Sequence, residues 1–317
     1  MTTPARILVT GATGFVGGHL LPALRQAFPA ATLIAGLHHD PAPGWDEALP
    51  TPLDSEAALA EALAEAAPDA VVHLAAQSNV AESFRAPEAT WNANLFGALR
   101  LGGAILRAAP KARLLFASTG EVYGLSFQRA EPLDEDAPLA PGNPYAAAKA
   151  AADLALGEMA LRGLRVVRMR PLNHVGPGQG TAFVVSAFAR QAARIAAGLQ
   201  PPVMQVGALE RWRDFLDVRD VCAAYALALG RFDDLPQGAI INLASGTPRK
   251  VGDILHALLA RAGVSAQVEE VAAALRPNDL LRSCGNAARA REWLGWAPVI
   301  PWETTLDDVY ADWRARV

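Results

Sequence analysis

The stretch RILVTGATGFVGGHL, residues 6–20, places a short apolar run directly before a glycine-rich turn and the start of a helical pattern. Gly11, Gly14 and Gly17 are spaced G-x-x-G-x-x-G, which differs from the common G-x-G-x-x-G. In such a unit the first glycine permits the tight turn, the second lets backbone approach a pyrophosphate, and the third lets helix and strand pack closely. The N–H groups at the helix N-terminus then bind the phosphates. The stretch therefore predicts a dinucleotide-binding loop followed by a helix. Pro22 lies inside this helix and should either kink it or make it start later.

Beyond this unit, short apolar runs alternate with longer helical patterns through the first two-thirds of the chain. Continuous apolar runs are typical of parallel strands that helices cover on both faces. The sequence therefore predicts an α/β fold with a doubly wound parallel sheet of the Rossmann type. The expected strands are 6–11, 31–37, 70–76, 113–119 and 164–171, and the expected helices run from the glycine loop to Phe28, over 55–67 with a Ser cap, over 89–109 and onward from about Pro144.

The texture of the sequence changes after residue 172. A Gly/Pro loop, NHVGPGQG, precedes a helical pattern at 182–198 and the Arg-rich stretch ALERWRDFLDVRD. We expect residues 1–171 to form the dinucleotide-binding domain and residues 172–317 to form mainly a smaller, mixed substrate-binding domain. The chain is expected to return to the sheet at about 212–245.

Composition narrows the classes of function. Hydrophobic residues make up 52% of the 317 residues and charged residues 19%, so a large buried core is expected. The net charge of -4 and the lack of a basic patch argue against nucleic acid as a partner. Cys222 and Cys284 belong to no Cys/His cluster, so no metal site is expected. No apolar stretch reaches the length of about 18 residues that a membrane span needs, which predicts a cytoplasmic protein without a membrane partner.

Tyr145 and Lys149 lie four residues apart in the alanine-rich run NPYAAAKAAAD, so they share one helix face. A Lys ammonium beside a Tyr hydroxyl favours the phenolate and lowers its pKa from about 10. The Tyr could then exchange a proton with a carbonyl or hydroxyl oxygen while a hydride passes to or from a nicotinamide. The Lys could also hold the nicotinamide ribose. Taken alone, the run is equally consistent with a helix whose surface carries a Lys.

Hydroxyl side chains end the strand that precedes this helix, in FASTGEVYG. Ser118 and Thr119 leave the strand at the carboxyl edge, where doubly wound sheets bind ligands. We expect Thr119 to hydrogen-bond the substrate oxygen and to steady Tyr145, with a Ser/Thr capping turn as the alternative. Glu121 is either a second acid/base group or a surface charge, and Tyr123 is interpreted as structural.

The end of the second strand bears on the choice of cofactor. An acidic residue there would hold the ribose of NAD, but the strand continues into His38 and His39 before Asp40. The histidine pair could accept a 2′-phosphate or form a solvated turn, and we interpret it as favouring NADP(H) over NAD(H). Asp54 is either a contact to the adenine ring or the N-cap of the following helix.

The motifs GATGFVG, HLAA, STGEVYG, YAAAK and RPLNHVGPGQ together resemble the extended short-chain dehydrogenase/reductase family, the NAD(P)-dependent sugar-nucleotide epimerase/dehydratase group. The resemblance covers essentially the whole chain. It implies an NAD(P) cofactor, a nucleotide-diphosphate sugar as substrate, and a homodimer that pairs through the helix at 90–108 and the helix of Tyr145.

The resemblance also assigns positions within the site. The catalytic positions that it implies are Thr119, Tyr145 and Lys149, with Glu121 as a further acid/base candidate. The cofactor positions are Gly11, Gly14, Phe15, Val16, Gly17, Leu74, Ala75, Ala76, Asn94, Ser118, Tyr145, Lys149 and Leu172. The substrate positions are Asn173, Val184, Arg213 and Arg276. Guanidinium groups suit phosphate, so the two arginines are expected to clamp the diphosphate, although Arg213 could instead pair with Asp214 or Asp217.

Two stretches, 170–191 and 206–221, most resemble family members that reduce the C4 carbonyl of a GDP-4-keto-6-deoxy-hexose, a step toward GDP-6-deoxy-mannose. A 4,6-dehydratase acting on GDP-mannose, or another nucleotide-sugar epimerase/dehydratase, is the alternative, and Glu121 would serve as its additional acid/base. The dehydratase usually carries an Arg-containing run after its NH motif, whereas this chain has VGPGQGTAFVVSAF. A non-catalytic NAD(P)-binding regulator is disfavoured because Tyr145 and Lys149 are both present.

Overall fold

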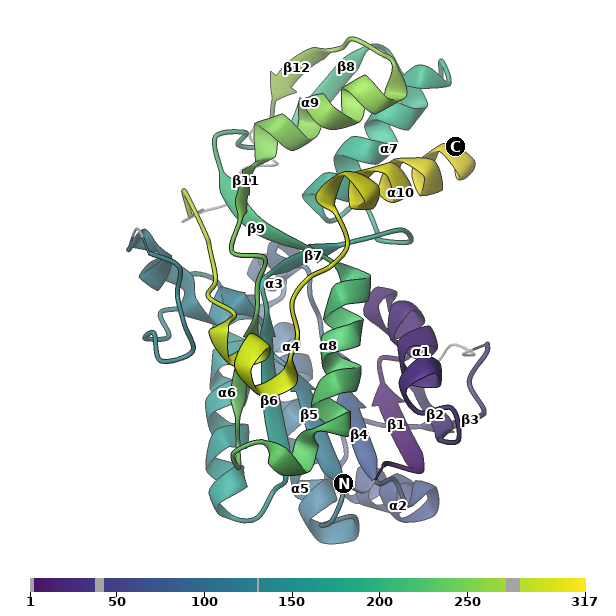
Figure 1. The fold of residues 1–317 in the computed structure, drawn as a ribbon, viewed down its shortest axis with the longest axis vertical. Coiled ribbons are helices and arrows are strands. Elements are labelled where there is room, and N and C mark those ends of the chain that lie inside the picture. Colours follow the sequence, from purple (N-terminus) through teal and green to yellow (C-terminus); the bar gives the residue numbers. More distant parts are fainter. Residues whose placement is uncertain (1–2, 38–42, 130, 272–279) are drawn as a thin grey trace.

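A parallel sheet forms the central layer of the molecule (Figure 1). The computed structural model describes residues 3–37, 43–129, 131–271 and 280–317. Among these residues the sheet has seven strands in the order β10-β6-β5-β4-β1-β2-β3, which confirms the predicted doubly wound architecture. The strands are β1 (Arg6–Thr10), β2 (Thr32–Leu37), β3 (Glu47–Pro50), β4 (Ala70–His73), β5 (Arg113–Ala117), β6 (Val166–Pro171) and β10 (Ile240–Leu243).

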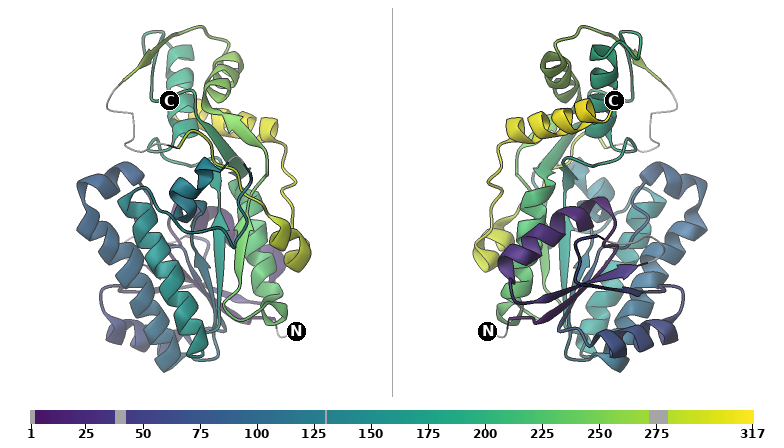
Figure 2. Two further views of the ribbon diagram at one scale, coloured as in Figure 1. Left: turned by 90° about the vertical axis from the view of Figure 1, so that its left-hand side faces the viewer. Right: turned by 90° about the vertical axis from the view of Figure 1, so that its right-hand side faces the viewer.

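Helices cover both faces of this sheet (Figure 2). Leu20, Leu24 and Val221 belong to one buried apolar cluster, and Leu59 and Leu101 belong to the other. Each such side chain contributes about 1.5–3 kcal/mol when it is removed from water. The first face carries α1 (Phe15–Ala27) and α8 (Val218–Gly230), and the second carries α2 (Glu56–Ala66), α5 (Gly97–Ala108) and α6 (Pro144–Leu161).

Two helices differ from the sequence prediction. α1 begins at Phe15 and runs through Pro22, so the predicted late start is wrong. Gly18 and Pro22 are both exposed, and water can therefore satisfy the Gly18 carbonyl that lacks its usual helical donor. The expected single helix at 89–109 is divided into α4 (Pro87–Trp91), a π-helical turn η1 (Asn92–Phe96) and α5.

A smaller part of the chain lies beyond the carboxyl ends of the central strands, with its own apolar core around Phe188, Leu255 and Leu306 (Figure 1). Its strands are β7 (Asn173–Val175), β9 (Trp212–Asp217) and β11 (Pro248–Lys250) in one sheet, and β8 (Val203–Val206) with β12 (Gln267–Glu270) in another. Its helices are α7 (Val184–Ala196), α9 (Val251–Ala262) and α10 (Trp302–Ala315).

Segments far along the chain return to the central layer. α8 packs against α1, β10 pairs with β6, and the π-helical turn η5 (Ala290–Leu294) contributes to the same apolar cluster as α1. In the described part of the chain, no helix has the length and apolar character that a membrane crossing would require.

Candidate active site

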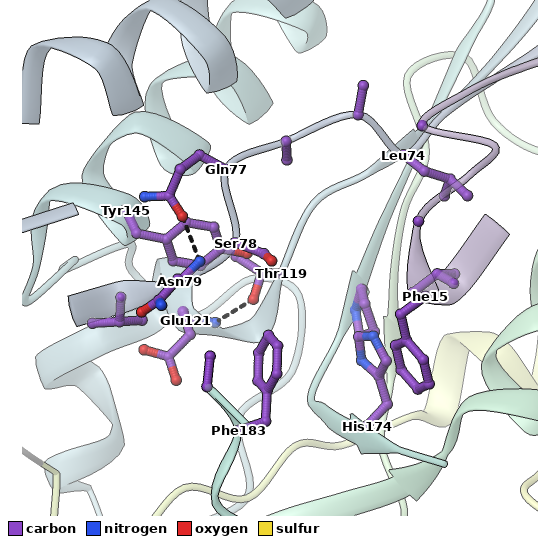
Figure 3. Close-up of a pocket in the computed structure, with 18 of the residues that line it drawn as sticks. Phe15, Leu74, Gln77, Ser78, Asn79, Thr119, Glu121, Tyr145, His174 and Phe183 are labelled. Atoms are coloured by element: carbon purple, nitrogen blue, oxygen red, sulfur yellow. Dashed lines mark hydrogen bonds between the residues drawn. The ribbon is translucent and has the colours of Figure 1, made fainter. Parts of the chain in front are cut away.

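A cavity of about 670 Å³ opens where the central strands end (Figure 3). Its walls follow the carboxyl ends of β1, β4, β5 and β6, on both sides of the point where the strand order reverses. Doubly wound sheets bind their ligands at this place. The predicted site residues that line it are Gly11, Gly14, Phe15, Val16, Gly17, Leu74, Ala75, Ala76, Thr119, Glu121, Tyr145, Leu172 and Asn173.

The glycine loop forms one end of the cavity, and its backbone geometry excludes side chains. Gly11 has a φ of 73°, and a Cβ there would lie 2.7 Å from the backbone nitrogen of Ala75. A Cβ on Gly17 would lie 2.3 Å from the carbonyl oxygen of Ala12, so this glycine approaches the loop itself. Gly14 is the N-cap of α1, whose first turn contains no acidic residue. An open helix N-terminus lined by backbone fits the pyrophosphate of a dinucleotide.

Aromatic rings stand beside this loop. His174 stacks on Phe15 with ring centroids 6.4 Å apart and planes inclined by 6° (Figure 3). Burial lowers the pKa of His174, while a hydrogen bond between Nδ1 and the carbonyl oxygen of Leu172 opposes that effect. A neutral imidazole that donates from Nδ1 follows from this. The sequence predicted no role for His174, because its stacking partner Phe15 lies far away along the chain, in α1.

Tyr145 faces the cavity from the first turn of α6, opposite Thr119 at the end of β5 (Figure 3). Both side chains line the same cavity. Burial raises the pKa of Tyr145 to about 12, although the Thr119 hydroxyl favours the phenolate, and the charge of Glu121 raises the pKa further. The predicted lowering of this pKa is therefore wrong for the protein alone, because burial is the largest effect on Tyr145 and raises its pKa. Thr119 also caps the 3₁₀ segment η2 (Gly120–Gln128) by accepting from the Glu121 N–H, which confirms the capping alternative, whereas its contact with a substrate oxygen stays a prediction.

Lys149 is buried behind Tyr145 on the next turn of α6. Its Nζ donates to the carbonyl oxygen of Ala117 at 2.5 Å and lies 4.1 Å from the centroid of the Phe116 ring. Burial lowers its pKa to about 7, and the charge of Asp153 opposes this. The long Lys side chain therefore ties α6 to the end of β5.

Asp153 makes a second tie one turn further along α6. It accepts hydrogen bonds from Ser118 Oγ at 2.6 Å and from Arg170 Nε and Nη2 at 2.9 and 2.8 Å. Although burial raises the pKa of Asp153, the hydrogen bonds and charge of Arg170 keep it below its ordinary value. Arg170 also donates to Tyr123, whose own hydroxyl donates to Asn242, so Tyr123 is structural as predicted. The Ser118 hydroxyl, expected near the cofactor, is directed into this buried network.

Asn94 lies in the π-helical turn η1 and is buried behind the cavity wall. Its Nδ2 donates to the Gln77 carbonyl at 2.9 Å, and its Oδ1 accepts from the Gln77 N–H at 2.8 Å. Extra turns of this kind are frequent at functional sites. Asn94 thus positions Gln77, Ser78 and Asn79, which line the cavity and which sequence reasoning missed (Figure 3). The polar run after HLAA was the only signal for them.

Some predicted positions lie elsewhere. Asp54 is exposed and does not line the cavity, although Thr51 and Leu53 nearby do. The N-cap of α2 is Ser55 and not Asp54. Val184 begins α7 and packs into the smaller core.

Arg213 is likewise not among the lining residues. In the pairing of β9 with β11, Arg213 lies opposite Arg249. The guanidinium carbon of Arg249 lies 4.9 Å from the centroid of the Trp302 ring. Asp217 and Asp214 were the alternative partners predicted for Arg213. Asp217 forms an ion pair with Arg219, and Asp214 accepts a hydrogen bond from the Ser245 hydroxyl. The predicted sites at His38, His39 and Arg276 fall outside the described residues.

A family model, described as the NAD dependent epimerase/dehydratase family, matches residues 7–244. The chain belongs to this family. Among its relatives, the GDP-6-deoxy-D-mannose reductase of Pseudomonas aeruginosa is 37% identical over 316 residues, covering 98% of each chain. The UDP-glucose 4-epimerase of Azospirillum brasilense is 31% identical, covering 95% of this chain and 93% of the relative.

Solved structures agree with this membership. RMD from Pseudomonas aeruginosa complexed with NADPH superimposes with a TM-score of 0.82 at 36% identity, covering 99% of this chain and 100% of that one. The UDP-glucose 4-epimerase of Thermus thermophilus in complex with NAD gives a TM-score of 0.84 at 29% identity, covering 98% and 100%. As a member of the family, the protein is an NAD(P)-dependent enzyme, and the predicted resemblance is confirmed.

Proposed function

We propose that the protein reduces the C4 carbonyl of a GDP-4-keto-6-deoxy-hexose with NADPH as the reductant. The observation that carries this proposal is that Thr119 and Tyr145 line the same cavity as the glycine loop. Support for the substrate class comes from the relative named GDP-6-deoxy-D-mannose reductase, and support for NADPH comes from the RMD complex.

The chain's own residues would act as follows. Gly11, Gly14 and Gly17 would hold the dinucleotide, which supplies the hydride when bound. Tyr145 would give its proton to the carbonyl oxygen as that oxygen gains charge. A pKa of about 12 keeps the phenol protonated at neutral pH, as a proton donor in the reducing direction requires. Thr119 would steady the phenol and donate to the same oxygen.

A 4,6-dehydratase or an epimerase is the second candidate. The observation that favours it is Glu121, which lines the cavity beside Thr119 and lies 3.5 Å from Nδ2 of Asn143. A dehydratase needs an additional acid/base group, and this carboxylate is placed to be one. A relative from Vibrio cholerae named GDP-mannose 4,6-dehydratase is 29% identical over 285 residues.

Activity assays separate these candidates. The purified protein would be mixed with GDP-4-keto-6-deoxymannose and NADPH, and cofactor oxidation followed by absorbance. Stoichiometric oxidation supports the reductase. Lack of oxidation with that substrate, together with turnover of GDP-mannose or UDP-glucose, overturns the reductase and supports the second candidate. Repeating the assay with NADH tests the proposed preference for NADPH.

We also propose a homodimer that pairs through α5 and α6. These helices pack side by side on one face of the sheet (Figure 2). α6 leaves Leu154 60% and Leu161 85% exposed, and these side chains lie two helical turns apart on one face of the helix. Light scattering of the purified protein tests this pairing, and a monomeric mass would contradict it.

A further inference from the structure

Ser283 has a buried hydroxyl without a partner. Among the described residues, two buried side-chain polar atoms lack a hydrogen bond, namely Ser283 Oγ and Arg249 Nε. Ser283 is only 4% exposed, yet it lines the cavity. An unsatisfied buried hydroxyl costs about 1–3 kcal/mol, and buried polar groups in native proteins nearly always have a partner. The hydroxyl therefore calls for a ligand that supplies one.

The position of Ser283 indicates which ligand. Its backbone N–H donates to the Trp212 carbonyl, so its segment runs beside β9 in the smaller part of the molecule. Two residues on, a Cβ on Gly285 would lie 2.6 Å from Leu172 Cδ2, and a Cβ on Gly120 would lie 2.8 Å from Leu172 Cδ1. Leu172 thus separates this segment from the turn after Thr119. Ser283 therefore reaches the cavity from a segment that pairs with the smaller part of the molecule.

The second unsatisfied atom has a different setting. The guanidinium of Arg249 lies over the Trp302 ring, and Arg249 does not line the cavity. Ser283 is therefore the unsatisfied group that a cavity ligand would reach.

We propose that Ser283 is a substrate-binding residue that hydrogen-bonds an oxygen of the nucleotide-diphosphate sugar. The oxygen belongs either to a hexose hydroxyl or to a phosphate, since a serine hydroxyl can donate to both. This inference rests on the proposed function, because it takes a nucleotide sugar as the occupant of the cavity beside Ser283.

Calorimetric titration of the NADPH-loaded protein with GDP-mannose and GDP, which are not substrates of the reduction, tests the proposal. Ser283→Ala should weaken the affinity for GDP-mannose by about 5- to 10-fold, the loss of one hydrogen bond. Equal weakening for GDP identifies a phosphate contact, and weakening for GDP-mannose alone identifies a hexose contact. The melting temperature of the ligand-free variant should equal or exceed that of the wild type, because no internal hydrogen bond is lost.

Ser126→Ala is the matched control. The Ser126 hydroxyl is also buried but donates to the Pro138 carbonyl at 2.8 Å. This variant should melt at a lower temperature and bind both ligands within twofold of the wild type. Affinities of Ser283→Ala within twofold of the wild type, or a lowered melting temperature for it, would overturn the proposal.

A parallel titration with UDP-glucose distinguishes a failure of the proposed GDP-sugar specificity from a failure of the proposed role of Ser283. If the wild type binds UDP-glucose and not GDP-mannose, the proposed GDP-sugar specificity fails, and the Ser283→Ala comparison is decided with UDP-glucose. If the NADPH-loaded wild type binds none of these nucleotides, both proposals are overturned.

Discussion

Replacing Arg170 with Met should strongly destabilise the protein, because it leaves a buried carboxylate without its main partner. Asp153 is fully buried and receives two of its hydrogen bonds from Arg170. Arg168 keeps one contact to Asp153 at 3.2 Å, so part of the charge stays compensated. Removing one member of a buried pair costs about 3–5 kcal/mol. For 317 residues, with about 2.1 cal/mol/K of unfolding entropy per residue, the melting temperature should fall by about 5–8 °C.

Arg162→Met, at the C-terminal end of α6, provides the control. Arg162 pairs with Glu158 at 2.9 Å, but their side chains are 58% and 59% exposed. Exposed pairs of this spacing are worth about 0.3–0.5 kcal/mol, so the melting temperature should change by less than about 1 °C. Thermal unfolding monitored by circular dichroism measures both variants.

A double variant, Asp153→Leu with Arg170→Met, tests the cause. Replacing both charges by apolar side chains removes the stranded carboxylate, so stability should recover relative to Arg170→Met alone. If Arg170→Met is as stable as Arg162→Met, the reasoning is refuted and Arg168 alone satisfies Asp153.

Three further outcomes follow from the site. Tyr145→Phe should lower kcat by about 10²- to 10⁴-fold in the NADPH oxidation assay while cofactor affinity stays the same, and near-normal turnover would contradict its role as proton donor. Gly17→Ala should weaken NADPH binding at least about tenfold in a fluorescence titration, because its Cβ would lie 2.3 Å from the Ala12 carbonyl oxygen. Gly18→Ala is the control and should bind NADPH normally, because a Cβ at Gly18 would have no atom within 4 Å. Burial lowers the pKa of Lys149 from 10.5 to about 7, so between these values the folded state binds fewer protons than the unfolded state, and stability rises with pH. Lys149→Met should therefore be more stable than the wild type below pH 7, and this gain should shrink as the pH approaches about 10 in urea unfolding; a gain independent of pH would refute the assigned pKa.

The central strands β1, β2, β4, β5 and β6 were predictable because each is a separate, largely apolar run that is buried between two layers of helices. β2 shows the rule, with Leu33, Ile34 and Ala35 all inaccessible to solvent. β3 escaped prediction because it lies at the sheet edge, where Glu47–Pro50 stays mostly exposed and needs no apolar pattern. The π-helical turn at Asn92–Phe96 also escaped, because Asn94 bonds there to Gln77, a partner outside its own helix.

The proposed catalytic positions were visible in the sequence only where their relation is local. Tyr145 and Lys149 are spaced by one helical turn, and Thr119 ends a strand before them, so the motif could be recognised. The pKa shifts were not predictable, since they depend on burial by elements far along the chain. The role proposed for Ser283 was not predictable either, because its place on the cavity wall results from pairing between residues 281–283 and Trp212.

The alanines of α6 have a packing role that their helix propensity does not reveal. Ala146, Ala148 and Ala152 are fully buried in α6, a helix that packs against η1, α4 and α5. Small side chains allow this close approach, and a larger residue in such a core would force a shift costing about 1–3 kcal/mol. The approach in turn lets the Nζ of Lys149 reach the carbonyl at the end of β5, next to Ser118 and Thr119. The distance between the Tyr145 helix and the Thr119 strand end is thus set by residues without functional groups, so a bulky substitution at Ala148 should impair catalysis through position alone.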